Sequence, residues 1–187
     1  MGLVQALFEG AMYIFVLQWP PAVKAAIAGA GWGSAAVVPY GKVFSCFMAC
    51  CLLGSSLFGR LQAAGVAVES STPLMLTAAT AALAYTASSS SPALLPLLAA
   101  FFVFEVCVGM YFPSIGTLRS KYLPDAHRSV LMNLFGIPLN LIVVSVFLSI
   151  RALGVRGALS FASAALAVAS LCMTALSRLA SRNASKN

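Results

Sequence analysis

The sequence predicts an all-α, polytopic membrane protein that folds as a six-helix transmembrane bundle. Of its 187 residues, 61% are hydrophobic and 8% are charged, whereas soluble domains are roughly half apolar and a quarter charged. Several apolar runs approach the length of about 20 residues that a spanning helix needs. Gly, Pro, Ser and charged residues gather between these runs. We therefore expect one transmembrane domain over residues 1–180, followed by a polar cytoplasmic tail over 181–187.

The first half of the chain is expected to hold three spans. They are predicted over residues 2–19, 43–58 and 73–88. The first should stop at Pro20 and Pro21, because consecutive prolines remove two backbone donors and clash with the preceding turn. The second contains the small residues Gly54, Ser55 and Ser56, which let helices approach closely in lipid. The apolar run of the third covers only about 14 residues, 74–87, which is short for a span, so this is the weakest prediction.

The second half is expected to hold three more spans. They are predicted over residues 93–112, 130–150 and 157–176. The fourth should end before Pro113, and a basic connector over 119–128 follows it. The fifth should be kinked or broken at Gly136 and Pro138, because a proline ring displaces the preceding turn and leaves a carbonyl without a donor. Six spans place both termini on one side of the membrane.

The charge distribution indicates how the bundle is oriented. The net charge of +7 comes from 11 basic and 4 acidic residues. The basic residues lie between the apolar runs, which fits contact with lipid head groups and disfavours a nucleic-acid partner. On the side of the termini they are Arg60, Arg119, Lys121, Arg128, Arg178, Arg182 and Lys186. On the other side they are Lys24, Lys42, Arg151 and Arg156. The positive-inside rule therefore predicts cytoplasmic termini.

Two glutamates inside the predicted spans are candidate functional residues. Glu9 and Glu105 each lie near the middle of an apolar run, where an unpaired carboxylate costs several kcal/mol. Protonation relieves much of that cost, so each is a candidate proton carrier. A structural hydrogen bond between helices is the competing interpretation for both residues.

Polar side chains on two predicted helices extend the candidate pathway. Gln5 and Tyr13 flank Glu9 at intervals of four residues, which places the three on one helical face. Asn133 and Asn140 are seven residues apart around the Gly136 break, and broken helices recur at transport sites. A polar seam between helices and a simple packing kink are the respective alternatives. Within the predicted spans there is no Lys, Arg or His to bind an anion.

The sequence disfavours catalysis and metal binding. The five cysteines, Cys46, Cys50, Cys51, Cys107 and Cys172, lie in apolar runs and lack the paired spacing of metal sites. His127 is the one histidine, and it belongs to the predicted connector. We find no deep His/Cys/Asp cluster of the kind that a hydrolase needs. We therefore expect no enzyme, no catalytic residues, no metal and no cofactor.

Three stretches of sequence carry a resemblance to a known family. They are QALFEGAMYIFVLQWPP at 5–21, FSCFMACCLLGSSLF at 44–58, and YFPSIGTLRSKYLPDAHRSVLMNLFGIPLN at 111–140. Together they resemble the molybdate-anion transporter family of the major facilitator superfamily, in the last six of its twelve helices. The resemblance implies a multi-pass plasma-membrane protein that forms half of a secondary transporter for molybdate or a similar oxyanion, with protons as a candidate coupling ion. In that superfamily, two six-helix halves hold the substrate between them.

The same resemblance leaves alternatives open. It implies an N-terminal transporter half, or a second copy of this chain, as the partner. It also implies an arginine at position 136, where this chain has Gly136, and a guanidinium would suit a tetrahedral dianion better than asparagines do. A non-transporting or truncated protein that partners a full-length carrier is one alternative. A transporter of another small solute, such as a sugar, is the other.

Overall fold

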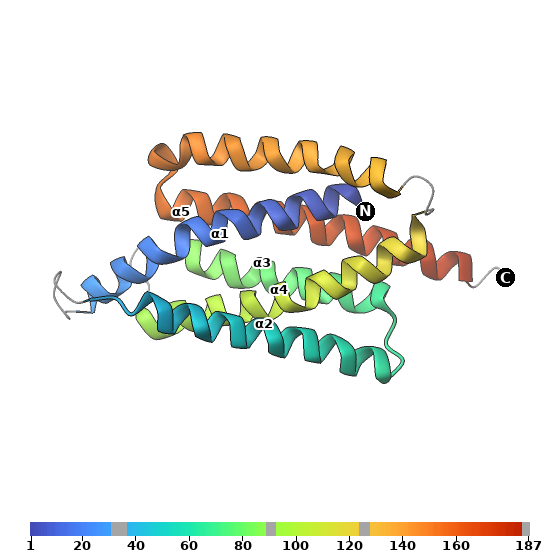
Figure 1. The fold of residues 1–187 in the computed structure, drawn as a ribbon, viewed down its shortest axis with the longest axis horizontal. Coiled ribbons are helices and arrows are strands. Elements are labelled where there is room, and N and C mark those ends of the chain that lie inside the picture. Colours follow the sequence, from blue (N-terminus) through green and yellow to red (C-terminus); the bar gives the residue numbers. More distant parts are fainter. Residues whose placement is uncertain (31–36, 89–92, 124–127, 185–187) are drawn as a thin grey trace.

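The structure, a computed structural model, confirms the all-α fold class. It describes residues 1–30, 37–88, 93–123 and 128–184, and these form helices without any strand. The helices are α1 (Gly2–Gly29), α2 (Tyr40–Ala63), α3 (Val68–Ser88), α4 (Leu94–Tyr122) and α5 (Arg128–Ala184). They lie roughly along one long axis, and both chain ends lie at the same end of the bundle (Figure 1). His127 and the last three residues of the predicted tail fall outside the described residues.

Helix α5 accounts for the difference between six predicted helices and five observed ones. The predicted connector after residue 150 is helical except at Gly154, whose φ of 62° turns the chain back. The two last apolar runs therefore form one element with two arms. The predicted break at Gly136 and Pro138 is wrong, because the helical backbone continues through both residues. The element ends at Ala184, so the first residues of the predicted tail are helical.

Helix α1 continues past the predicted end of its span. Pro20 and Pro21 lie inside the helix, which ends only at Gly29. Trp19, Ala22 and Val23 are all buried around the prolines. Packing on both sides of the prolines thus holds the helix together, as it does in other membrane helices that contain proline. As a consequence, Glu9 lies in the first third of α1 and not at its centre.

Helix α4 likewise continues through Pro113, to Tyr122. Proline has no N–H to donate to the carbonyl of Gly109 four residues earlier. The Ser55 hydroxyl of α2 donates to this carbonyl at 3.0 Å and replaces the missing donor. The buried residues Ile115 and Leu118 continue the packed face beyond the proline. This extension brings Arg119 into the helix.

Two glycines bring α2 and α4 into backbone contact. A Cβ atom added at Gly54 would lie 2.0 Å from the Val106 carbonyl oxygen, and one added at Gly109 would lie 1.9 Å from that of Cys51. Side chains larger than hydrogen cannot fit there. The two helices therefore pack at a distance that only these glycines permit, as in other membrane helix pairs.

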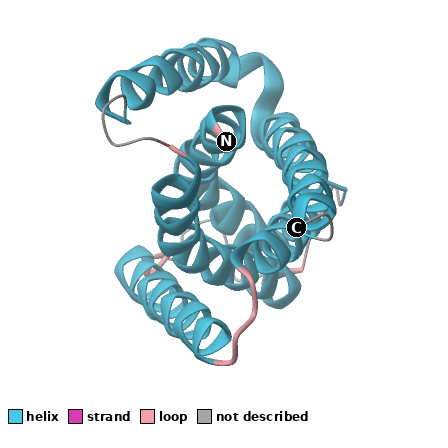
Figure 2. Ribbon diagram, turned by 90° about the vertical axis from the view of Figure 1, so that its right-hand side faces the viewer, coloured by secondary structure: helices cyan, strands magenta, loops and turns pink. Residues whose placement is uncertain are grey.

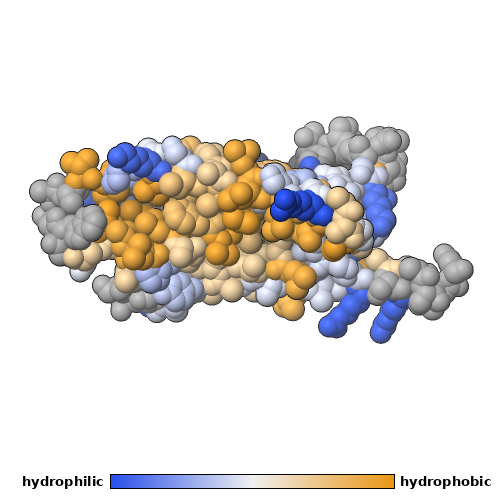
Figure 3. Space-filling view, turned by 90° about the horizontal axis from the view of Figure 1, so that it is seen from below, coloured by the Kyte–Doolittle hydropathy of each residue, from blue (hydrophilic) through white to orange (hydrophobic). Residues whose placement is uncertain are grey.

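Apolar helices of membrane-spanning length make this a multi-pass membrane protein. Helices α1, α2 and α4, and the Leu153–Ala180 segment of α5, are long and apolar enough to span a bilayer. Helix α3 is not among them, because its Ser, Thr and Glu69 side chains lower its hydropathy. Apolar surface covers much of the face in Figure 3, and the hydrophilic residues form separate patches on it. Figure 2 shows the helices of the bundle roughly end-on.

Candidate functional site

Aromatic side chains fix how α1 and α4 face each other. Phe15 of α1 meets Phe101 of α4 edge to face, with ring centroids 5.0 Å apart. Phe8 stacks on Tyr111 with centroids 3.9 Å apart. Residue numbers fall along α1 as they rise along α4, so the two helices run antiparallel. This register places Glu9, the neighbour of Phe8, beside the second half of α4.

Glu9 belongs to a polar cluster that joins the two helices. The Tyr111 hydroxyl donates to Glu9 Oε1 at 3.2 Å. Arg119 Nη2 lies 3.8 Å from the same oxygen. The Glu9 and Arg119 side chains are 18% and 21% exposed, so the charges are largely removed from water. We call Glu9, Tyr111 and Arg119 the Glu9 cluster.

Arg119 has unused hydrogen-bond donors in this cluster. A guanidinium carries five N–H groups. The distance of 3.8 Å to Glu9 gives attraction but is too long for a hydrogen bond. Arg119 Nε is buried and has no hydrogen-bond partner within the described part of the chain. The site therefore contains a partly buried cation that an additional acceptor could bind.

The sequence interpretation missed Tyr111 and Arg119. It ended the fourth span before Pro113, which left Arg119 in a connector. A signal for the longer helix was present, because Tyr111, Ile115 and Leu118 recur at helical spacing across the proline. All three are buried in the structure. The expectation that this chain offers no obvious cation for an anion therefore needs correction.

The three polar residues that were predicted to share one face of α1 lie in different environments. Gln5 is buried, Glu9 is half-buried and Tyr13 is 47% exposed. Four residues turn an α-helix by about 40° beyond a full circle, so a repeat of four rotates away from a fixed neighbour. Of these three residues, Glu9 is the one that contacts the polar residues of α4.

The other predicted residues do not join the Glu9 cluster in the described structure. Glu105 is buried on α4, but 14 positions separate it from Arg119, a rise of about 21 Å. Asn140 is exposed and Gly136 half-buried on α5. The side chain of Asn133 lies outside the described residues. Thus Glu9 is the predicted site residue with an observed charged partner.

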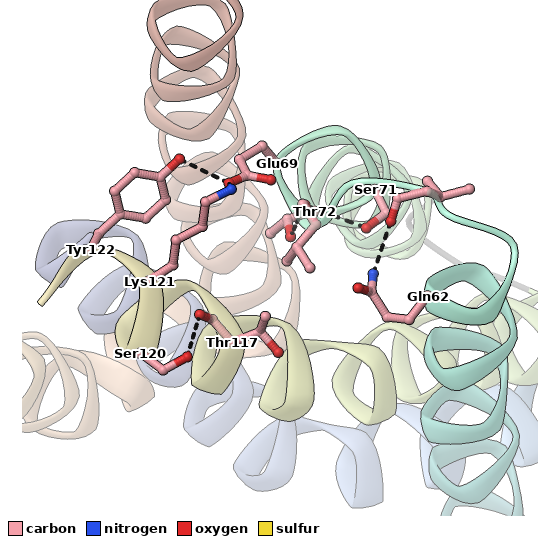
Figure 4. A network of polar contacts seen from close by, with 10 residues as sticks. Gln62, Glu69, Ser71, Thr72, Thr117, Ser120, Lys121 and Tyr122 are labelled. Carbon is pink, nitrogen blue, oxygen red and sulfur yellow. Dashed lines mark hydrogen bonds and ion pairs between the residues drawn. The ribbon is translucent and has the colours of Figure 1, made fainter. Parts of the chain in front are cut away.

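A second carboxylate cluster joins α3 to the end of α4 (Figure 4). Lys121 Nζ and the Tyr122 hydroxyl donate to Glu69 Oε1 at 2.6 and 2.8 Å. Glu69 precedes the predicted span 73–88. Burial, the largest influence, raises its pKa, but the hydrogen bonds from Lys121, from its own backbone and from Tyr122 together lower the pKa below the ordinary value of 4.5. We call these three residues the Glu69 cluster.

Two apolar hollows contain no member of either cluster in their linings. One of about 400 Å³ is bounded by α2, α3 and α4, and Leu57, Met75 and Val106 are among its lining residues. The other, of about 500 Å³, lies between α3 and α4 beside Ala78 and Tyr85. Neither presents a charged side chain. Within the described ranges no group of three His, Cys, Asp or Glu residues could hold a metal ion.

A bundle of membrane-length helices with a charged pair between two of them defines the class of polytopic helical membrane proteins. Residues 1–106 match the family of sugar transporters with 12 transmembrane helices, MFS_5. Because the match covers more than half of the chain, this protein belongs to that family.

Curated relatives are named molybdate-anion transporters. The protein of Takifugu rubripes is 31% identical over 154 residues, which cover 76% of this chain and 28% of the relative. The protein of Xenopus laevis is 29% identical over 187 residues, covering 94% of this chain and 39% of the relative. This chain thus spans roughly a third of the length of these relatives. No solved structure matches it significantly.

Proposed function

We propose that this chain forms part of a secondary transporter that moves molybdate or a similar oxyanion across a membrane. The observation that carries the proposal is the Arg119 guanidinium, which is largely buried between α1 and α4 and has unused donors. Arginine suits tetrahedral oxyanions because its planar fork presents parallel N–H groups to two oxygens. Membership of a transporter family and the names of the relatives support transport and give no support to an enzyme.

A partner is part of this proposal. The chain covers less than half of each relative described above, and facilitator transporters bind substrate between two helical halves. We propose that an N-terminal half, or a second copy of this chain, supplies the other wall of the site. Gln5, Glu9 and Tyr13, together with Glu105, Asn133, Gly136 and Asn140, remain the candidate pathway residues. Glu9 or Glu105 would carry the coupling proton.

We propose that the chain crosses the plasma membrane six times and has both termini in the cytoplasm. The two chain ends lie at one end of the bundle (Figure 1), as an even number of crossings requires. The carboxyl ends of α2 and α4, with Arg60, Arg119 and Lys121, point the same way. This basic end favours the cytoplasmic side.

A second candidate function is transport of a sugar, because the family description names sugars. A neutral sugar would not need the charge of Arg119, whereas an oxyanion would. Competition distinguishes the two candidates: unlabelled tungstate or sulfate should reduce molybdate uptake, and a sugar in excess should not. The reverse result would favour a sugar.

The direct test is uptake of labelled molybdate by transport-deficient cells. The cells would express this chain alone, or together with the N-terminal half of a relative, and membrane insertion would be verified in each case. We expect uptake with the N-terminal half and a loss of uptake for the Arg119→Gln variant. Lys121→Gln is the matched control, since it removes a charge of the same sign two residues away. Absence of uptake in every inserted combination would refute the proposed function.

A further inference from the structure

We propose that the Glu9 carboxylate occupies the anion position beside Arg119 in the unloaded protein, so that an oxyanion binds by displacing it. This inference rests on the proposed function and adds how the site sets its affinity for the oxyanion. Glu9 would act as an internal competitor of the substrate. The competition would take place within the Glu9 cluster, among Glu9, Tyr111 and Arg119.

The ion pair between Glu9 and Arg119 is loose. A strong arginine–carboxylate pair has N–O distances of about 2.7–2.9 Å and is often bidentate. The Arg119–Glu9 pair has a separation of 3.8 Å, and Arg119 Nε has no acceptor among the described atoms. The carboxylate therefore balances the charge of the guanidinium without saturating its donors. A pair of this kind can be opened at a lower cost than a fully hydrogen-bonded one.

Glu9 has a hydrogen-bond donor other than Arg119. A partly buried carboxylate without a partner is costly, so a competitor needs another donor within reach. The Tyr111 hydroxyl already donates to Glu9 at 3.2 Å. Its ring is held by stacking on Phe8, so the donor is fixed in place. Glu9 can leave Arg119 and still keep one hydrogen bond.

The ligand that would replace Glu9 is a tetrahedral oxyanion. A tetrahedral oxyanion offers several oxygens in place of the single carboxylate oxygen that faces Arg119. It could accept from Nε and Nη2 together, which Glu9 does not do. An anion of this geometry gains hydrogen bonds that the internal competitor lacks. Molybdate and sulfate share this chemistry, and the test uses both.

The experiment measures binding of labelled molybdate, and then sulfate, to this chain co-purified in detergent with the N-terminal half of a relative, by equilibrium dialysis. The Glu9→Gln variant keeps the shape and removes the competing charge. We expect it to bind molybdate about fivefold more tightly than the wild type, which corresponds to about 1 kcal/mol. Glu69→Gln is the matched control, since it removes an equal charge from the other cluster, and its affinity should stay within about twofold of the wild type.

The outcomes separate this inference from the proposed function. If the wild type binds molybdate and Glu9→Gln binds it equally or more weakly, the competitor role is overturned while the proposed function survives. If Glu69→Gln tightens binding as much as Glu9→Gln, the effect is one of net charge and the inference is also overturned. If the folded wild-type complex binds neither anion, both the proposed function and the inference fall.

A second variant covers the case in which Glu9→Gln does not fold. Tyr111→Phe removes the hydroxyl that holds the displaced carboxylate and keeps the ring that stacks on Phe8. We expect its molybdate affinity to fall by about threefold, because the displaced Glu9 carboxylate is then left without a donor. An unchanged affinity in the folded Tyr111→Phe variant would contradict the inference.

Discussion

Helix α4 ends between two carboxylates, Glu9 on α1 and Glu69 on α3, and its last residues bind them in different ways. Glu69 receives hydrogen bonds of 2.6 and 2.8 Å from Lys121 and Tyr122. Glu9 receives one of 3.2 Å from Tyr111, and its ion pair with Arg119 is longer still. The same helix thus makes one tight cluster and one loose cluster.

The difference between the clusters separates a structural role from a binding role. Donors committed to short hydrogen bonds stabilise one arrangement of helices and leave little for a ligand. The donors of Arg119 are largely uncommitted and lie in a partly buried site, where a charged interaction is stronger than at the surface. We infer that the Glu69 cluster holds α3 against α4, and that the Glu9 cluster is available to a solute.

The largest expected effect comes from moving α4, which would disturb both clusters together. Gly109→Ala places a Cβ atom 1.9 Å from the Cys51 carbonyl oxygen, so the α2–α4 contact must open. Overpacking of this kind costs about 3 kcal/mol. We expect a large loss of thermal stability in detergent. Size-exclusion chromatography of heated samples measures this loss. Gly116→Ala on the same helix meets no atom within 4 Å and should be as stable as the wild type.

The next effect should separate the two cations at the end of α4. Arg119→Gln removes the unused donors of the Glu9 cluster, and we expect molybdate affinity to fall about tenfold or more, the worth of a hydrogen bond to a charged group. Lys121→Gln affects the Glu69 cluster and should leave molybdate affinity within about twofold. Equilibrium dialysis with labelled molybdate measures both. Equal losses in the two variants would show that the clusters do not differ in function.

A smaller effect concerns thermal stability. Stability should depend more on the Glu69 cluster than on the Glu9 cluster, which is the reverse of the order expected for molybdate binding. Glu69→Gln weakens two short hydrogen bonds, whereas Glu9→Gln weakens one long hydrogen bond and a loose ion pair. We expect the melting temperature to fall by about 2–4 °C for Glu69→Gln, and by less for Glu9→Gln. A larger loss for Glu9→Gln would reverse the structural assignment of the two clusters.

The smallest effect is a pH dependence of the stability that the Glu69 carboxylate gives the folded protein. Its pKa lies below the ordinary value of 4.5 in the folded protein, so the unfolded chain takes up the proton first as the pH falls. The stabilisation is therefore complete above about pH 4.5 and is lost as the pH falls through the lower, folded pKa. The difference in melting temperature between the wild type and Glu69→Gln should shrink between pH 6 and pH 3. A difference that stays constant over this range would contradict the assignment.

The membrane class and the helical fold were predictable because both depend on local properties. A run of apolar residues defines a spanning helix whatever it packs against, since lipid requires internal backbone hydrogen bonds. The family was likewise predictable from the stretches at 5–21 and 44–58, which lie within the matched residues 1–106. Glu9 could be identified as a candidate because a carboxylate within an apolar run needs a partner.

The helix ends and the partners of Glu9 depend on residues that are distant in sequence. Whether a helix continues through a proline depends on which group donates a hydrogen bond to the freed carbonyl. For the Gly109 carbonyl the donor is Ser55 on another helix. That continuation turns Arg119 from a predicted connector residue into a neighbour of Glu9. The sequence alone determined that this protein lies in the membrane as apolar helices. Only the tertiary structure decided which charges meet, because an ion pair between α1 and α4 depends on how the two helices pack.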